Sequence, residues 1–175
     1  MSGFDRDAFI AELRSAATAD DAPARIKALV AEAVADPAAV HTAMEDLVDD
    51  DVILFEDDTV SIWRCRFPVG TSVPPHDHRM RATIGLYAGA ERNSFFERDD
   101  HGAAVLAESV VLTPGEVLQI DGDVIHAVTT EGSEPCCGIH VYLGKLTTVE
   151  RSLFDPENGE AMAYSDANYE RLTQA

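Results

Sequence analysis

The sequence predicts a mainly β protein, a barrel or jelly roll of short strands that follows a layer of N-terminal helices. Apolar residues recur at three-to-four spacing through the first fifty residues, which is the period of an amphipathic helix. From Asp51 onward, short runs rich in β-branched and aromatic residues alternate with turn residues. At 175 residues one domain, 1–175, is the natural count, with 1–50 as helical layer, 51–150 as barrel and 151–175 as a tail packed on the barrel.

Three helical stripes are expected before the barrel. Their apolar residues are Phe9, Ile10, Leu13 and Ala17, then Ile26, Leu29, Val30 and Val34, then Val40, Met44, Leu47 and Val48. Asp36 and Pro37 are typical of a helix start, because an aspartate caps the first turn and proline is tolerated at the first helical position. About fifty residues of this kind would have difficulty folding alone, so we expect them to pack against the barrel.

Eight short strands are expected after the helices. They span residues 52–55, 60–67, 83–87, 93–97, 105–112, 117–120, 124–129 and 138–143. Residues 99–102 and 113–115 contain the glycine and proline of turns between them. Strands of this length and spacing are typical of a barrel or jelly roll. The chain from Pro156 is expected to be a tail with a short helix at 167–172.

The charge balance limits the possible partners. The chain has 13 lysines and arginines against 32 aspartates and glutamates, a net charge of −19. This charge opposes binding to phosphate backbones and to anionic membranes, so we expect a small-molecule substrate and neither nucleic acid nor membrane as partner. No apolar run approaches the roughly 20 residues that span a bilayer, and no signal peptide is visible, which favours a cytoplasmic location. A monomer and a homodimer are equally compatible with the sequence.

The three cysteines predict no disulfide framework. Cys136 and Cys137 are adjacent, and adjacent cysteines rarely bridge because the geometry is strained. Together with Cys65 they are interpreted as reduced, buried thiols.

Three histidines are the candidate metal ligands. His76 and His78 are two residues apart, so on a strand they point to the same side, roughly 6–7 Å apart. His126 ends a second segment that begins at Gly115. Three neutral imidazoles from two strands make a facial metal site with open positions for a substrate and for oxygen or water. The alternatives are an exposed turn for the first two and a core position for the third.

This layout resembles the cupin superfamily, whose members are double-stranded β-helix (jelly-roll) barrels. Both sequence motifs of the superfamily are present, in the usual order. The first is a glycine, five residues and His-x-His, and the second is a later glycine-to-histidine segment. The matching residues are Gly70, His76, His78 and Gly89 in the first motif, and Gly115 and His126 in the second. The glutamate that the family carries in the first motif falls on Ala82 or Thr83, and Asp121 and Asp123 stand where proline and glycine are usual. The resemblance is therefore to three-histidine cupins.

Among these, the chain resembles thiol dioxygenases of the cysteine dioxygenase type, which have a serine, a histidine and a tyrosine at alternate positions of a later strand. His140 and Tyr142 match, whereas Gly138 replaces the serine. Residues 153–159 resemble the segment that follows the barrel in the same group. The resemblance implies that His76, His78 and His126 hold Fe(II), that Tyr142 positions substrate and O2, and that His140 supports Tyr142. The donor set alone is also compatible with zinc, nickel, copper or manganese.

Substrate recognition departs from this group. The cysteine that animal-type enzymes link to the tyrosine falls at Thr83, so no such crosslink forms there. The stretch 51–58, where the group carries its carboxylate-binding arginine, has none. Arg64, Arg66 and Arg81 are the candidate substrate-binding residues. The first two share one side of a strand, and they would hold a carboxylate in a bidentate manner if that side faces inward, or be surface charges if it faces outward.

The first function hypothesis is therefore a mononuclear non-heme iron dioxygenase that oxidises a small thiol to a sulfinate with O2. The absence of the usual arginine suggests either an aminothiol or a carboxylate bound by another arginine. The alternatives keep the metal and change the chemistry to a carbon–carbon cleaving dioxygenase, a lyase or an isomerase. A non-catalytic cupin that binds a metal or ligand is the third possibility.

Overall fold

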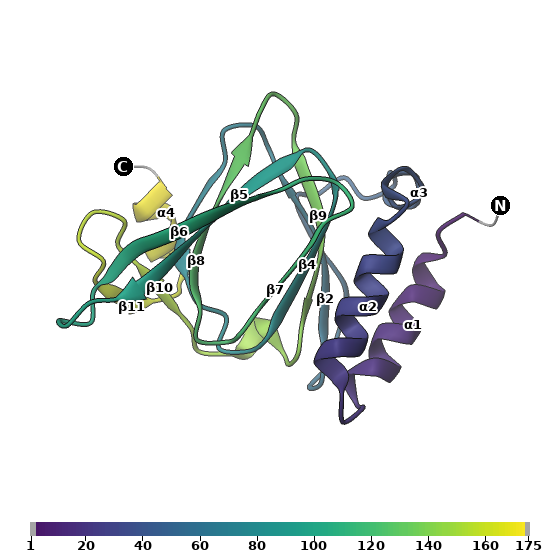
Figure 1. The fold of residues 1–175 in the computed structure, drawn as a ribbon, viewed down its shortest axis with the longest axis horizontal. Helices are drawn as coiled ribbons and strands as arrows, with labels where there is room; N and C mark the ends of the chain where they lie inside the picture. Colours follow the sequence, from purple (N-terminus) through teal and green to yellow (C-terminus); the bar gives the residue numbers. More distant parts are fainter. Residues whose placement is uncertain (1–2, 174–175) are drawn as a thin grey trace.

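A computed structural model describes residues 3–173 of the chain as two antiparallel sheets that face each other, with helices on the outside of one of them (Figure 1). The first sheet has the order β1 (Asp51–Glu56), β2 (Ser61–Phe67), β9 (Cys136–Tyr142), β4 (Ala82–Ala88) and β7 (Val117–Ile120). The second has the order β11 (Ala161–Ala163), β10 (Ser152–Phe154), β3 (Ser72–His76), β8 (Ile125–Glu131), β5 (Ala90–Arg98) and β6 (Ala104–Leu112). The predicted fold class, a mainly β jelly roll with an N-terminal helical layer, is confirmed.

Three helices cover the outer face of the first sheet. They are α1 (Arg6–Ala17), α2 (Ala22–Val34) and α3 (Pro37–Ala43). Asp5 and Asp36 cap α1 and α3 with their side chains, and Leu13, Ile26 and Val30 are fully buried against the sheet. Helix α2 packs so closely on β4 that a Cβ at Gly85 would lie 2.4 Å from a methyl group of Val30. No helix within residues 3–173 combines the length and the apolar character that crossing a bilayer requires.

The third helix is shorter than its apolar stripe predicts. It ends at Ala43, and Val48 is 85% exposed. The buried Arg64 guanidinium donates to the carbonyl oxygen of Leu47 at 2.7 Å and to that of Asp50 at 3.5 Å. These hydrogen bonds satisfy backbone acceptors in the turn that leads into β1, so the tertiary contact favours a turn where the local periodicity favours a helix.

The eight predicted strands are present, and three more are found: β3, which leads into His76, and two in the tail. Leu153 of β10 pairs with His76 of β3, and β11 pairs with β10, so the chain beyond the barrel extends the second sheet. A short 3-10 helix (Leu146–Thr148) precedes them and α4 (Asp166–Thr173) follows. Strands of three residues have no detectable periodicity, which is why the sequence predicts only a tail and a helix here. The three cysteines are buried and free, as predicted.

Candidate metal centre

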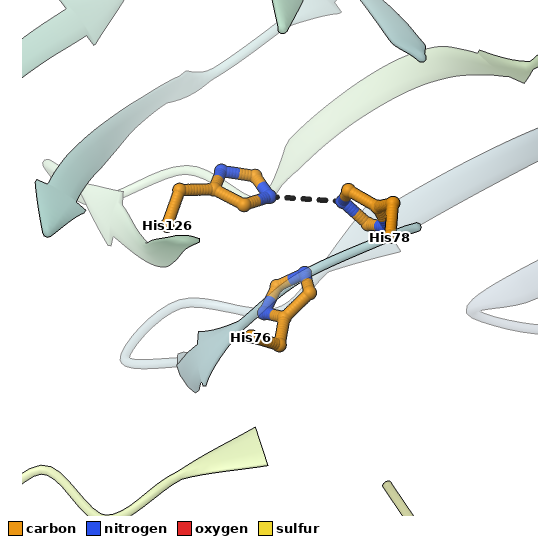
Figure 2. A group of neighbouring side chains, drawn as sticks. All are labelled: His76, His78 and His126. Carbon is orange, nitrogen blue, oxygen red and sulfur yellow. Dashed lines mark hydrogen bonds between the residues drawn. The ribbon is translucent and has the colours of Figure 1, made fainter. Parts of the chain in front are cut away.

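His76, His78 and His126 converge between the two sheets. His76 ends β3 and lies directly opposite His126 of β8 in the strand register. Figure 2 shows the three rings turned toward one another, and each offers a nitrogen within 4.8 Å of the other two. The Nε2 atoms of His78 and His126 are 3.0 Å apart. This confirms the prediction that the three histidines lie close together.

The backbone of β3 and of the turn that follows it positions His76 and His78. Pro74 and Pro75 have no N–H to donate to the ladder, and the register between β3 and β8 shifts between Val73 and His76. After His78 the chain turns sharply at Arg79, whose φ is +56°, and the Arg79 N–H donates to the Gly122 carbonyl oxygen at 2.8 Å. A Cβ at Gly122 would lie 2.6 Å from the backbone nitrogen of Met80, so this close approach requires glycine.

Hydrogen bonds to carbonyl oxygens orient two of the three rings. The Nδ1 atom of His76 lies 2.8 Å from the Pro74 carbonyl oxygen, and the Nδ1 atom of His126 lies 2.9 Å from Oδ1 of Asn93. Both partners are acceptors, so both Nδ1 atoms carry the proton and both Nε2 atoms present a lone pair. This is the usual outer support of metal-binding histidines.

Burial keeps the three imidazoles neutral. Each ring residue is at most 5% exposed. Desolvation lowers the pKa of His76 from 6.5 to about 4, and it lowers the pKa of His78 and of His126 well below 6.5. A histidine binds a metal only in its neutral form, so the ligand set is in the binding state at neutral pH.

These shifts predict that the metal-free protein loses stability in mild acid. Between pH 6.5 and about 4 the histidines of the unfolded chain bind protons, whereas buried histidines such as His76 and His140 do not. The free energy of unfolding therefore falls as the pH falls through this window. Each such histidine contributes about 1.4 kcal/mol per pH unit inside the window. The urea midpoint of metal-free protein, measured from about pH 7.5 down to about pH 5, should drop accordingly. A midpoint that stays level over this range would contradict the burial of the neutral rings.

The donor set fits a facially bound ion without a carboxylate ligand. Two ligand nitrogens in adjacent coordination positions, each about 2.1 Å from the ion, are about 3.0 Å apart. The Nε2 atoms of His78 and His126 have this separation. Asp77 is buried between the first two histidines, but its carboxylate accepts from the Ser152 N–H at 2.8 Å and pairs with Arg79 at 3.0 Å. Ala82 packs in an apolar cluster and Thr83 accepts from Gln119, so neither supplies a ligand.

A cavity of about 250 Å³ opens above the three rings. Its inner walls are mostly apolar and come from both sheets and the 3-10 helix, with Trp63, Phe67, Val128 and Leu146 among them. Its outer walls are polar and come from β1 and the C-terminal tail: Asp51, Arg151, Tyr164, Asp166 and Tyr169. The tail thus completes a pocket that the barrel alone would leave more open.

His140 and Tyr142 line the same cavity. Nδ1 of His140 lies 3.2 Å from the hydroxyl of Tyr142, whose ring centroid lies 5.0 Å from that of His78. Burial raises the pKa of Tyr142 well above its usual value, so the phenol keeps its proton. Nε2 of His140 is buried with no hydrogen-bond partner in the described chain, and a Cβ at Gly138 would lie 3.2 Å from it. Gly138 has no side chain that could donate to or accept from this nitrogen.

The predicted substrate-binding arginines do not line this cavity. Arg64 is 2% exposed and faces the helical side of the first sheet, while Trp63 and Cys65, on the opposite side of the strand, face the cavity. Arg66 pairs with Asp50 at 2.6 Å, and Arg81 pairs with Asp121. Their placement corrects the expectation that they face the pocket: Arg64 donates to two backbone carbonyl oxygens on the helical side, and Arg66 and Arg81 pair with carboxylates outside the cavity.

Arg151 is the residue that the sequence prediction missed. Among the described residues that line the cavity, it alone has a cationic side chain, and its guanidinium carbon lies 3.7 Å from the ring centroid of Tyr164. It also lies near enough to the ligands that its charge contributes to the lowered pKa of His76 and His78. It immediately precedes β10, and no motif marks it.

Comparisons with known proteins support the fold. No family model matches the chain. A Bacillus halodurans protein of known structure aligns with a TM-score of 0.52 at 11% identity, over 71% of this chain and 84% of that one. A cupin superfamily protein from Desulfitobacterium hafniense aligns with a TM-score of 0.44 at 22% identity, over 54% and 76% of the two chains.

An enzyme is also among the similar structures. A DMSP lyase from Ruegeria pomeroyi aligns with a TM-score of 0.47 at 20% identity, over 64% of this chain and 55% of its own length. An alignment at this identity assigns no activity to this chain. The chain has the fold of a jelly roll of two antiparallel sheets, with a group of three histidines between the sheets that could hold a metal ion.

Proposed function

We propose that the protein is a mononuclear iron dioxygenase that converts a small thiol bearing one anionic group into its sulfinate. The overall reaction, R–SH + O2 → R–SO2H, places both oxygen atoms on sulfur. The observation that carries the proposal is the arrangement of one cavity: three neutral imidazoles at its base, a phenol beside them and a guanidinium among its outer walls.

His76, His78 and His126 would hold the metal through their Nε2 atoms. When bound, Fe(II) supplies the positive charge that favours the thiolate form of a coordinated thiol, together with the redox chemistry that dioxygen requires. Three neutral ligands leave positions free on the cavity side. The apolar walls around Trp63 and Phe67 exclude water from that side, which protects a reactive sulfur and strengthens the polar contacts within the cavity.

Tyr142 would orient the reactants. If the Nδ1–H of His140 donates to the tyrosine oxygen, the phenol O–H is free to donate into the cavity. Because the pKa of the phenol is raised, this donor persists at any physiological pH. His140 acts through Tyr142 and is a positioning residue.

Arg151 would bind the anionic group of the substrate. A planar guanidinium matches a carboxylate with two parallel hydrogen bonds, and stacking on Tyr164 holds it in place. Asp51 and Asp166 line the same cavity, so a second negative charge on the substrate would be repelled, whereas an ammonium group would be accepted. The substrate class is therefore a small thiol with one carboxylate.

The test is oxygen uptake by the Fe(II)-loaded protein with a panel of small thiols, with the product identified by mass spectrometry. Carboxylate-bearing thiols should consume one O2 for each sulfinate formed, and an aminothiol of similar size should react much more slowly. The absence of uptake with every thiol would overturn the proposal. Turnover that persists without oxygen would instead favour a lyase or isomerase that uses the metal as a Lewis acid.

Replacing Tyr142 with phenylalanine should lower kcat about 10- to 100-fold, because one hydrogen bond to a charged reactant is worth about 1.5–3 kcal/mol. The hydroxyl contacts His140, and the ring packs in the cluster around Ala82, so the variant keeps its packing. Metal content should not change. The check is steady-state oxygen uptake with metal analysis of the same samples, and full activity in the variant would remove Tyr142 from the mechanism.

A further inference from the structure

A buried polar chain leads from the metal centre into the second sheet. Asn93 accepts from Nδ1 of His126 at 2.9 Å and donates through Nδ2 to Oε1 of Glu91 at 2.8 Å. The thiol of Cys136 donates to the other oxygen of Glu91 at 3.4 Å. Glu91 and Asn93 lie two apart on β5, so both point inward, and both are fully buried.

Glu91 lacks a cationic partner. No lysine, arginine or histidine among residues 3–173 forms an ion pair with it within 4.0 Å, and its two neighbours in the chain of contacts are neutral donors. Burial raises the pKa of this carboxyl group, and the two donated hydrogen bonds oppose that effect. Burying a carboxylate without a compensating charge is costly, so its position needs a physical reason.

The metal centre has the complementary need. His76, His78 and His126 offer imidazole nitrogens, which bind a metal as neutral donors, so a divalent cation among them would have no negative charge in its ligand set. Asp77, the buried carboxylate between the first two ligands, is already paired with Arg79. Glu91 is a buried carboxylate that is connected to a ligand and committed to no other cation.

We infer that Glu91 is the counter-charge of the metal ion, coupled to it through Asn93 and His126. The carboxylate polarises the Asn93 amide, whose oxygen then attracts the Nδ1–H of His126 more strongly and makes Nε2 a better donor to the ion. Glu91 is thus a positioning residue that tunes metal affinity. The inference rests on the metal site of the proposed function and is independent of the thiol chemistry.

Glu91→Gln tests this inference, because glutamine keeps the shape and can still accept from Asn93 while removing the charge. Zn(II) affinity, measured by competition with a chromophoric chelator, should fall about tenfold, the lower end of the range for partners outside the ligand set. Thermal unfolding of the metal-free variant should be unchanged or shifted upward, since a buried charge without a partner is gone. Glu97→Gln, the same exchange at an exposed position of β5, is the matched control and should change neither quantity.

A merely structural Glu91 gives the opposite pattern. Lower stability of the metal-free variant with unchanged Zn(II) affinity would overturn the inference. If the glutamine variant does not fold, Glu91→Met removes the charge with an apolar side chain of similar length, and wild-type Zn(II) affinity in that variant would overturn it equally. If the wild-type chain itself bound no Zn(II), the metal site and both proposals would fail, whereas equal affinities for wild type and variant remove only the role of Glu91.

Discussion

Replacing His78 with alanine is expected to abolish both metal retention and oxygen uptake. Its Nε2 faces that of His126 at 3.0 Å, and removal of one of three ligands leaves two neutral donors for a divalent ion. The loss of metal affinity should exceed the roughly 100-fold that marks the upper end for partners outside the ligand set. Elemental analysis of the purified variant, combined with an oxygen electrode and the thiol panel, measures both effects.

His78 is the most suitable ligand for this experiment, because its Nδ1 has no hydrogen-bond partner within the described chain and little structure depends on it. The metal-free variant should therefore have circular dichroism like that of metal-free wild type. His101→Ala, in an exposed turn, is the matched control and should keep full metal content. A His78→Ala protein that still holds one equivalent of iron would contradict the three-histidine site.

The second large effect is expected from Arg151→Met, which removes the cation and keeps much of the chain length. For a thiol with a carboxylate, kcat/KM should fall about 10- to 100-fold, since a hydrogen bond between charged groups contributes about 1.5–3 kcal/mol. This fall in kcat/KM should come mainly from an increase in KM. The carboxylate is distant from the reacting sulfur and is bound equally before and during the reaction. A thiol of similar size without a carboxylate should be affected little.

Two further variants separate charge from position. Arg151→Lys keeps the charge but loses the planar fork, so it should recover part of the affinity for the carboxylate. Arg81→Met, whose side chain pairs with Asp121 outside the cavity, should behave as wild type. Equal losses in Arg81→Met and Arg151→Met would show that the general field of an acidic protein is responsible, and a direct contact with Arg151 would then be excluded.

The fold and the ligands could be predicted because their signals are local. The helical stripes and the short strands follow from periods of three-to-four and two residues, and both periods are visible in neighbouring residues. His76, His78 and His126 carry the spacing of two recognisable motifs, and the tertiary structure brings them together. The strand pattern also placed Arg64 and Trp63 on opposite faces of β2, which is correct.

The direction of those faces could not be predicted. The first sheet has the cavity on one side and the helices on the other, so both of its faces are buried, and burial alone does not decide which face lines the cavity. Arg64 is fully buried on the helical side because the carbonyl oxygens of Leu47 and Asp50 accept its hydrogen bonds. An arginine that donates to backbone carbonyl oxygens has the same sequence pattern as one that binds a substrate.

The sequence by itself determined the architecture and three imidazoles around one point, because residue spacing within a strand and motif order along the chain fix them. Only the tertiary structure decided what surrounds that point. Arg151 reaches the cavity because β10 returns to pair with β3, and Glu91 reaches His126 through Asn93 because β5 pairs with β8. Such contacts join residues that are distant in the sequence, 33 positions apart for Asn93 and His126. Their free energy depends on strand pairing across the whole barrel, which no local pattern of residues records.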